Sequence, residues 1–257
     1  MQNKSLGLWQ RIFHRRAIRR WARLARNAEQ EALPALRVQR SYARAARAHL
    51  DRLIHIADDR LALPSIGSSS IEKPHNADWA WRPGLWRGAL PSPGMSSAET
   101  RSKLGEDVTV FHDCVSSELT LRQIRNTRAH DLAPYGVRMD VFRFDGSFLS
   151  LVIDLPNEAI EGLKRSHLLS MAALVEFEKP LEIFARLNIS HGPNTEQIVR
   201  ELPLGKDAIA VEFDLAYSSM NEKRVDKAWI DLIFEGPEMN QITLRDVTLS
   251  RRPRAPL

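Results

Sequence analysis

The chain has 257 residues, of which 43% are hydrophobic and 27% charged, and its formal net charge is +5 at pH 7. These proportions are typical of a soluble globular protein, and no apolar run approaches the roughly 20 residues that cross a bilayer. The single cysteine, Cys114, excludes an internal disulfide framework and a cysteine zinc site.

The positive charge is concentrated at the N-terminus. Residues 1–60 carry 14 basic and 5 acidic side chains, whereas the remainder carries 23 basic and 27 acidic ones. Residues 1–63 are predicted to form a basic helical arm, with one helix over residues 5–33, a break or kink at Pro34 and a second helical segment over residues 35–63. At 100° per residue one apolar face of the first helix contains Leu6, Trp9, Phe13, Ala17, Trp21, Leu24 and Ala28.

Eight basic residues precede the first acid of the arm, Glu29. The arm is either a solvated helix that packs on its neighbour or on a second copy of the chain, or a surface for an anionic partner. That partner is a membrane surface or nucleic acid, although no recognised nucleic-acid motif is present; an organellar targeting segment has a similar composition. The candidate residues for contact with an anionic surface are Arg15, Arg16, Arg19, Arg20, Arg23 and Arg26.

No apolar signal-peptide core follows the basic N-terminal residues, so we expect a cytoplasmic protein, placed at the membrane periphery if the arm binds lipid. Residues 64–78 are rich in Ser, Pro and Gly and predict a flexible linker. Residues 79–107 are predicted to form a tryptophan-rich strap and loop, here called the strap. Its rings, Trp79, Trp81 and Trp86, either fill a gap at the edge of a core or provide an exposed stacking platform for a sugar or a base.

A two-residue period of apolar side chains dominates residues 108–254 and predicts an antiparallel β-sandwich. The clearest case is residues 181–189, where apolar positions alternate with Glu182, Phe184, Arg186 and Asn188. Residues 116–126 are predicted to form the one helix of this region. Strands are predicted at residues 108–113, 137–144, 147–155, 167–177, 181–189, 194–202, 208–215, 228–235 and 240–250.

The segment "WIDLIFEGPEMNQITLRDVTLSRRPRA" at residues 229–255 resembles the closing strands of jelly-roll β-sandwiches of the galactose-binding, carbohydrate-binding-module type. This resemblance implies a mainly β, jelly-roll-like two-layer sandwich, with Asp246 at a family aspartate position and Trp229 in the core. The family's exposed aromatic platform and calcium carboxylates cannot be assigned from the sequence. From Trp79 to Pro253 the chain also resembles an uncharacterised bacterial family classed as a domain of unknown function, which implies no activity.

The most polar segment between two predicted strands is "NISHGPNTEQ", residues 188–197. It is either an Asn/Gly/Pro turn or a hydrogen-bonding site for sugar hydroxyls. The candidate ligand-binding residues there are Asn188, His191, Asn194, Glu196 and Gln197, in addition to the three strap tryptophans. "YSSMNEKRVDK", residues 217–227, is a similar loop that would border the same end of the sandwich.

Catalytic and metal chemistry have little support in the sequence. "FHDC" at residues 111–114 places a histidine and a cysteine close together, but such a cysteine is more commonly a small buried hydrophobe. The eight histidines show no spacing typical of a metal site, and no phosphate-binding or dinucleotide motif is present. We therefore expect no metal and no cofactor.

The sequence favours a non-enzymatic binding or structural protein. In this interpretation the sandwich recognises a glycan or another extended polar ligand, and the arm localises or oligomerises it. Two alternatives stay open, an adaptor that binds a membrane surface or nucleic acid through residues 1–60, and an enzyme that acts on polysaccharide.

Overall fold

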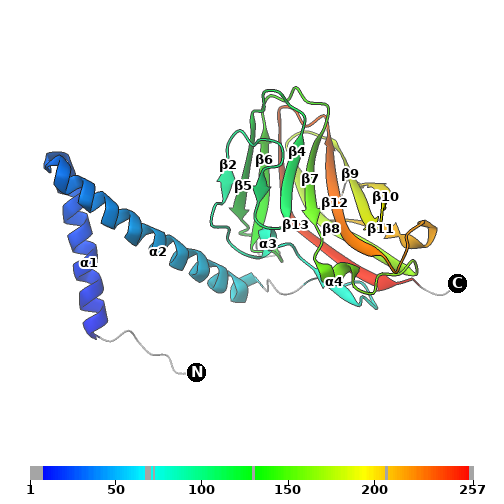
Figure 1. The fold of residues 1–257 in the computed structure, drawn as a ribbon, viewed down its shortest axis with the longest axis horizontal. Coiled ribbons are helices and arrows are strands. Elements are labelled where there is room, and N and C mark those ends of the chain that lie inside the picture. Colours follow the sequence, from blue (N-terminus) through cyan, green and yellow to red (C-terminus); the bar gives the residue numbers. More distant parts are fainter. Residues whose placement is uncertain (1–7, 67–70, 72, 129–130, 206–207, 255–257) are drawn as a thin grey trace. The chain divides into compact units, whose positions relative to one another are not determined.

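The computed structural model describes residues 8–66, 71, 73–128, 131–205 and 208–254 (Figure 1). The chain divides into two compact units, Met1–Ile54 and His55–Leu257, here called the arm unit and the sandwich unit. No helix among the described residues is both long enough and apolar enough to cross a membrane.

The arm unit is helical, as predicted. It contains α1 (Leu8–Asn27), the short 3-10 helix η1 (Ala28–Gln30) and the beginning of α2 (Leu33–Ile66). The first helix ends at Asn27, earlier than the break expected at Pro34. Pro34 instead lies in the first turn of α2, where its missing N–H costs no intrahelical hydrogen bond. The linker predicted at residues 64–78 lies partly outside the described residues and stays a prediction.

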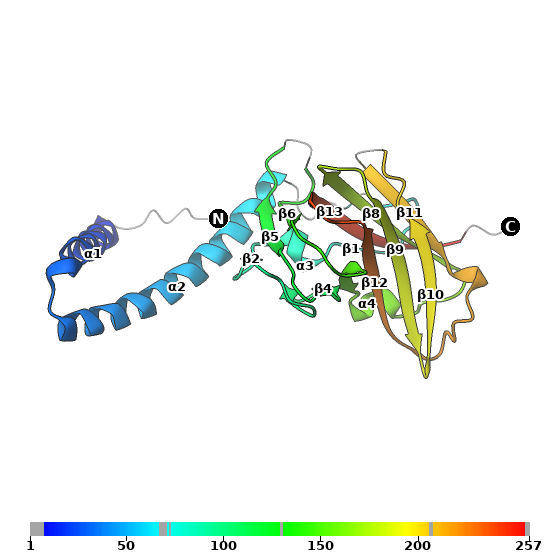
Figure 2. The ribbon, with the colours of Figure 1, turned by 90° about the horizontal axis from the view of Figure 1, so that it is seen from above.

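The sandwich unit consists of two antiparallel sheets stacked as layers (Figures 1 and 2). The seven-stranded sheet has the order β11-β8-β13-β6-β5-β2, with β1 paired to the end of β13. Its strands are β1 (Trp79–Trp81), β2 (Gly94–Met95), β5 (Leu119–Arg125), β6 (Tyr135–Val141), β8 (His167–Phe177), β11 (Ala208–Asp214) and β13 (Asn240–Pro253).

The six-stranded sheet has the order β10-β9-β12-β7-β4-β3. Its strands are β3 (Lys103–Leu104), β4 (Val108–His112), β7 (Leu149–Asp154), β9 (Glu182–His191), β10 (Asn194–Glu201) and β12 (Val225–Glu235). The short helices of the unit are α3 (Gly84–Arg87), α4 (Asn157–Ile160) and η2 (Leu215–Tyr217). The mainly β, two-layer antiparallel sandwich that the alternating pattern predicts is therefore confirmed.

One predicted element is wrong. Residues 116–126 contain β5 rather than a helix, and β5 pairs with β6 along its whole length. Leu119 and Leu121 are 0% and 1% exposed and face the core two residues apart. A strand is the conformation that brings residues at this spacing onto one buried face.

Side chains of the strap bind to β13 beside an irregularity in that strand. The pairing of β13 with β8 shifts register between Leu244 and Asp246, which is a β-bulge. The indole N–H of Trp86 donates to the Leu244 carbonyl oxygen at 2.9 Å, and the Asn126 amide donates to the Arg245 carbonyl oxygen at 2.8 Å. Side chains from elsewhere in the chain thus satisfy the carbonyl groups that the bulge removes from the regular ladder.

A buried ion pair holds the strap beside this bulge. Nε and Nη2 of Arg82 each donate to a different carboxylate oxygen of Asp246, both at 2.8 Å. Arg82 is 2% exposed and Asp246 6% exposed. The aspartate that the resemblance singles out is therefore a structural residue, whose partner was not identified from the sequence.

We predict that Asp246→Ala lowers the free energy of unfolding by about 3–5 kcal/mol, because it removes the carboxylate that accepts two hydrogen bonds from the buried Arg82 guanidinium. Urea unfolding followed by circular dichroism measures this. The matched control is Glu176→Ala, which breaks the ion pairs of a half-exposed carboxylate to Arg128 and, at 3.7 Å, to Arg245, and should cost no more than about 1 kcal/mol. Equal losses for the two variants would contradict a structural role for the buried pair.

A buried histidine, His167, lies near Asp78, the residue that precedes the strap. His167 is 8% exposed, and its Nδ1 accepts a hydrogen bond from the Lys164 main-chain N–H at 3.0 Å. Burial and, secondarily, the charge of Arg251 lower the pKa of His167 below its ordinary value, although Asp78 opposes them. The unfolded chain therefore takes up a proton at a higher pH than the folded chain does.

We predict that stability falls as the pH is lowered from about 7.5 to about 5, because protonation of His167 then favours the unfolded state. Thermal unfolding at a series of pH values should show a shallower decline for His167→Asn than for the wild type. The exposed His75 provides the control, His75→Asn, which should retain the wild-type decline. An unchanged pH profile in His167→Asn would be inconsistent with this assignment.

Candidate functional site

The candidate site is built around β12, which lies between β9 and β7 in the six-stranded sheet. One face of this strand packs in the core and the other faces outward. Ala228, Ile230, Leu232 and Phe234 point into the core and are 0–1% exposed. The side chains between them face outward. Trp229 is therefore half-buried on the outer face of the sheet rather than in the core, contrary to the expectation from the sequence.

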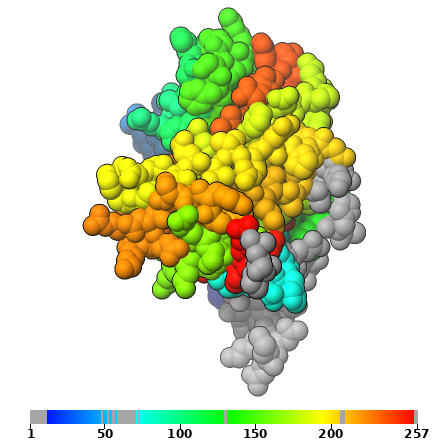
Figure 3. All heavy atoms as spheres, turned by 90° about the vertical axis from the view of Figure 1, so that its right-hand side faces the viewer, coloured from blue at the N-terminus to red at the C-terminus, as the bar shows by residue number. Residues whose placement is uncertain are grey.

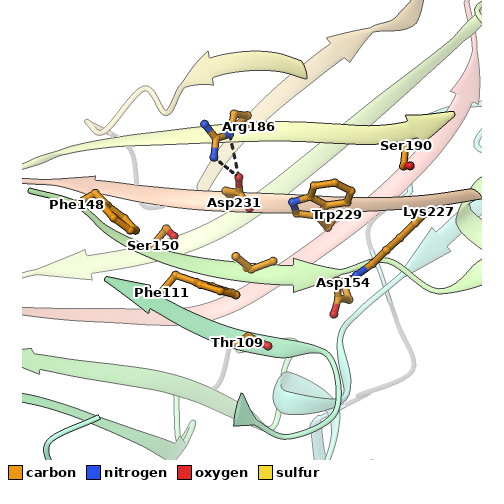
Figure 4. A pocket seen from close by; sticks show the side chains of 11 residues that line it. Thr109, Phe111, Phe148, Ser150, Asp154, Arg186, Ser190, Lys227, Trp229 and Asp231 are labelled. Atoms are coloured by element: carbon orange, nitrogen blue, oxygen red, sulfur yellow. Dashed lines mark hydrogen bonds and ion pairs between the residues drawn. The ribbon is translucent and has the colours of Figure 1, made fainter. Parts of the chain in front are cut away.

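An open pocket of about 620 Å³ lies on this outer face (Figure 4). Four neighbouring strands, β4, β7, β12 and β9, and the residue preceding β7 supply its walls and floor. The lining residues are Thr109, Phe111, Phe148, Ser150, Val152, Asp154, Arg186, Ser190, Lys227, Trp229 and Asp231.

Strand register places polar groups on both sides of the Trp229 ring. Asp154 on β7 and Asn188 on β9 are the direct cross-strand neighbours of Trp229. Gln197 on β10 is in turn opposite Asn188. One row across the sheet therefore reads carboxylate, indole, amide and amide, with all four side chains on the same face.

Asp231 is the centre of a hydrogen-bond network at one end of the pocket. Its Oδ2 accepts from Nε and Nη2 of Arg186 at 2.9 and 2.6 Å, and from the Asn188 amide at 3.1 Å. The Gln197 amide donates to Asn188 Oδ1 at 2.9 Å. No described residue donates a hydrogen bond to Asp231 Oδ1, so this oxygen keeps its capacity to accept one from a ligand.

A second ion pair lies at the other end of the pocket. Lys227 Nζ is 2.8 Å from Asp154 Oδ1 and 5.5 Å from the centroid of the Trp229 ring, within the range of a cation–π contact. The Trp229 ring thus lies along β12 between two charged pairs, as Figure 4 shows. Both side chains of the Lys227–Asp154 pair are partly exposed, which leaves them accessible to a bound molecule.

Two further aromatic side chains complete the apolar part of the pocket. Phe111 is half-buried on β4, and Phe148, immediately before β7, is 43% exposed. Ser150 is opposite Phe111 in the register of β7 and β4, and Val152 is opposite Thr109 one pair farther along the same face. Apolar rings beside a few fixed polar groups are the usual composition of a small-molecule site.

The structure divides the candidate residues of segment 188–197 between the two sides of the sheet. The segment is the hairpin of β9 and β10 rather than a loop, and Gly192 at its turn has a φ of +67°, which glycine adopts without strain. Asn188 and Gln197 extend the pocket network on the outer face, although Asn188 is only 1% exposed. His191 is buried, while Asn194 lies exposed beside the turn.

The segment 217–227 borders this hairpin, as expected. Ser219 Oγ donates to Glu196 Oε2 at 2.5 Å, and the Gly192 main-chain N–H donates to Asp226 Oδ2 at 3.0 Å. Figure 3 shows the hairpin (yellow) and this segment (orange) side by side on one face of the sandwich unit. Glu196 is thereby engaged within the protein, away from the pocket that contains Trp229.

The strap tryptophans lie apart from this pocket. Trp86 is 0% exposed and belongs to the core, where a ligand cannot reach its ring. Trp79 and Trp81 are half-buried, pack against the core and stack on each other with ring centroids 6.4 Å apart. Trp81 also lines a second open pocket of about 900 Å³, whose other lining residues belong to the strap itself apart from Pro156.

The histidine and cysteine of "FHDC" make structural hydrogen bonds with main-chain atoms and with each other. His112 Nε2 lies 2.9 Å from the Ala98 carbonyl oxygen, and His112 Nδ1 accepts from the Cys114 main-chain N–H. Burial raises the pKa of the Cys114 thiol, which disfavours the reactive thiolate. Among the described residues no group of three or more His, Cys, Asp and Glu side chains is arranged to hold a metal ion.

Comparison with solved structures finds distant similarities to carbohydrate-binding modules. The family 11 module from Clostridium thermocellum, in complex with a β-1,3-1,4-mixed-linked tetrasaccharide, has a TM-score of 0.40 and 10% identity, covering 63% of this chain and 99% of that one. The CBM22-1 xylan-binding domain from Paenibacillus barcinonensis Xyn10C has a TM-score of 0.37 and 8% identity over 63% and 94% of the two chains. These scores leave the ligand to be argued from the pocket itself.

A third similar structure is TmCBM61 in complex with β-1,4-galactotriose, with a TM-score of 0.33 and 15% identity over 55% of this chain and 86% of that one. No curated protein matches the chain. The family model described as "Family of unknown function (DUF6478)" matches residues 1–257.

We predict that Asp231→Ala lowers the free energy of unfolding by about 1–3 kcal/mol, because the buried Asn188 amide loses one of its two acceptors and Arg186 loses its carboxylate partner. Chemical unfolding measures the loss. The control Asp154→Ala breaks a more exposed pair at the opposite end of the pocket and should cost less than about 1 kcal/mol. If Asp231→Ala were as mild as the control, the pocket network would not be the rigid arrangement inferred from its geometry.

Proposed function

Because the chain belongs to DUF6478, a family of unknown function, we propose its function from the pocket: the outer face of the six-stranded sheet binds an uncharged glycan and catalyses no reaction on it. The observation that carries this proposal is the placement of the half-buried Trp229 ring between the Arg186–Asp231 and Lys227–Asp154 pairs.

The Trp229 ring supplies the apolar part of such a contact. One face of a pyranose ring presents mainly C–H groups, which pack on the face of an aromatic ring, while the hydroxyl groups project from the rim of the sugar. Trp229 is held by its cross-strand neighbours, so little conformational entropy is lost when a sugar stacks on it. Phe111 and Phe148 extend the apolar surface across β4 and the start of β7.

The charged side chains of the pocket supply its hydrogen-bonding groups. Because their charges cancel, the pocket does not select strongly for a charged ligand. Asp154 and Asp231 are balanced within the pocket by Lys227 and Arg186, so the local net charge is zero. A net-neutral pocket favours an uncharged ligand that both donates and accepts hydrogen bonds. Sugar hydroxyls do both, and the free acceptor capacity of Asp231 Oδ1 matches a hydroxyl donor.

The same pairs argue against catalysis. Hydrolysis of a glycosidic bond commonly uses two carboxyl groups, one of which donates a proton to the leaving group. Here both carboxylates of the pocket are engaged by cations and serve as fixed acceptors. We therefore propose recognition alone.

The proposal is tested by screening the full-length protein on a glycan array and measuring affinity by calorimetry for each hit. The soluble probes include a β-1,3-1,4-mixed-linked tetrasaccharide, xylohexaose and β-1,4-galactotriose, which are the ligands of structures similar to this chain. We expect Trp229→Ala to weaken binding at least about 10-fold, equivalent to about 1.4 kcal/mol.

The matched control is Tyr217→Ala, which removes an aromatic side chain that is 83% exposed and lies outside the pocket. This control should bind with wild-type affinity. Failure of every glycan to bind, or equal affinity of the Trp229 variant and the wild type, would overturn the proposal. Unchanged circular dichroism and thermal unfolding of both variants separate loss of binding from loss of folding.

A further inference from the structure

Helix α1 contributes no residue to the pocket of the sandwich unit, and its charged side chains are all basic. Helix α1 (Leu8–Asn27) contains no acidic residue, and the first acid after it is Glu29. Six of its arginines have described side chains, and all six are exposed: Arg15, Arg16, Arg19, Arg20, Arg23 and Arg26. Such a helix lacks the internal ion pairs that stabilise an ordinary charged surface helix, and its arginines repel one another.

The arginines and the apolar side chains occupy opposite sectors of α1. At 100° per residue the six arginines fall within a sector of about 140°. The facing sector, also about 140° wide, contains Phe13, Ala17, Ile18, Trp21, Leu24 and Ala25. Ile12 is the one large apolar side chain among the arginines in the described part of the helix.

The apolar sector is not buried within the arm unit. Phe13 is 63% exposed and Ile18 54% exposed. Water around these side chains is unfavourable, at roughly 25 cal/mol for each Å² of apolar surface. An exposed aromatic and aliphatic face opposite a predominantly cationic face indicates that α1 acquires a partner with both apolar and anionic character.

We infer that α1 binds the surface of a membrane that contains anionic lipids. In this arrangement the helix lies parallel to the surface, Phe13, Ile18 and Trp21 insert among the acyl chains near the headgroups, and the arginines contact lipid phosphates. The guanidinium group suits this role because it forms paired hydrogen bonds with phosphate. The helix lies on the membrane and does not span it, since no described helix is long and apolar enough to cross.

Two other occupants fit this helix less well. Nucleic acid would satisfy the arginines but leave Phe13 and Ile18 in water. A second copy of α1 would bury the apolar sector, but it would bring two helices together that both carry arginines and no acids, without the opposite charges that stabilise paired helices. The lipid surface is the partner that satisfies both sectors, and the inference is independent of what the sandwich binds.

The test is co-sedimentation of the full-length protein with vesicles of phosphatidylcholine alone and of phosphatidylcholine mixed with phosphatidylglycerol. We expect binding to the mixed vesicles, weak binding to the neutral ones, and a loss of binding at high salt. Replacing Arg16, Arg20 and Arg23 together by Gln should weaken binding to the mixed vesicles about 100-fold, from about a factor of five for each charge.

The matched control replaces Arg37, Arg40 and Arg44 of α2 by Gln, which removes the same charge from another exposed helix. This control should retain most of the binding. The double variant Phe13→Ser/Ile18→Ser keeps every charge and should bind mixed vesicles at least about 10-fold more weakly than the wild type.

Each alternative occupant predicts a different outcome. Wild-type vesicle binding by Phe13→Ser/Ile18→Ser, together with tight binding of duplex DNA, would overturn the inference in favour of nucleic acid. Absence of vesicle binding, combined with an oligomer in sedimentation-velocity analysis that the same double variant dissociates, would overturn it in favour of self-association. Unchanged helix content in circular dichroism verifies that the arm unit of each variant is folded.

Discussion

The structure of the sandwich unit depends on the two-residue alternation of β12. The strand is paired on both edges, to β7 and to β9, so its register is fixed twice. Ile230 and Leu232 commit one face to the core, and this commits Trp229 and Asp231 to the opposite face. A slip of one residue would turn the core side chains to the outer face and turn the Asp231 carboxylate into the apolar core. The hydrophobic effect that builds the core therefore also holds the pocket side chains in place.

The tryptophan-rich strap packs against the other sheet, at the bulge of β13. Trp86 and Arg82 are both buried beside the β13 bulge, where they satisfy a carbonyl group and the Asp246 carboxylate. The composition of the strap predicted either a core-filling or a ligand-binding role. It could not identify Arg82 as the partner of Asp246, because the two residues are 164 positions apart and nothing in the sequence links them.

Much of the sandwich was predictable, and much less of the pocket. All nine strands predicted from alternation are present. Most bury one face in the core, whereas the edge strand β10 only packs Ile198 against it. The Leu and Arg residues of β5 have good helix propensity, so a helix was predicted there. Pairing with β6 stabilises a strand instead. Trp229 was assigned to the core on the resemblance to the closing strands of jelly-roll sandwiches, although the polar Asp231 two positions later marked the outer face of the strand. Phe111 and Arg186 join the pocket only through strand order, which the sequence does not contain.

The two recognition surfaces that we propose lie on separately organised units and differ in chemistry, one being an arginine-rich helix and the other a neutral aromatic pocket. The most direct test of the pocket is a titration of the protein, followed through its tryptophan indole N–H resonances by NMR, with the tightest-binding oligosaccharide. The account predicts that the Trp229 resonance shifts and saturates with the ligand while that of Trp86 stays in place. Shifts confined to Trp79 and Trp81 would contradict it and place recognition on the strap.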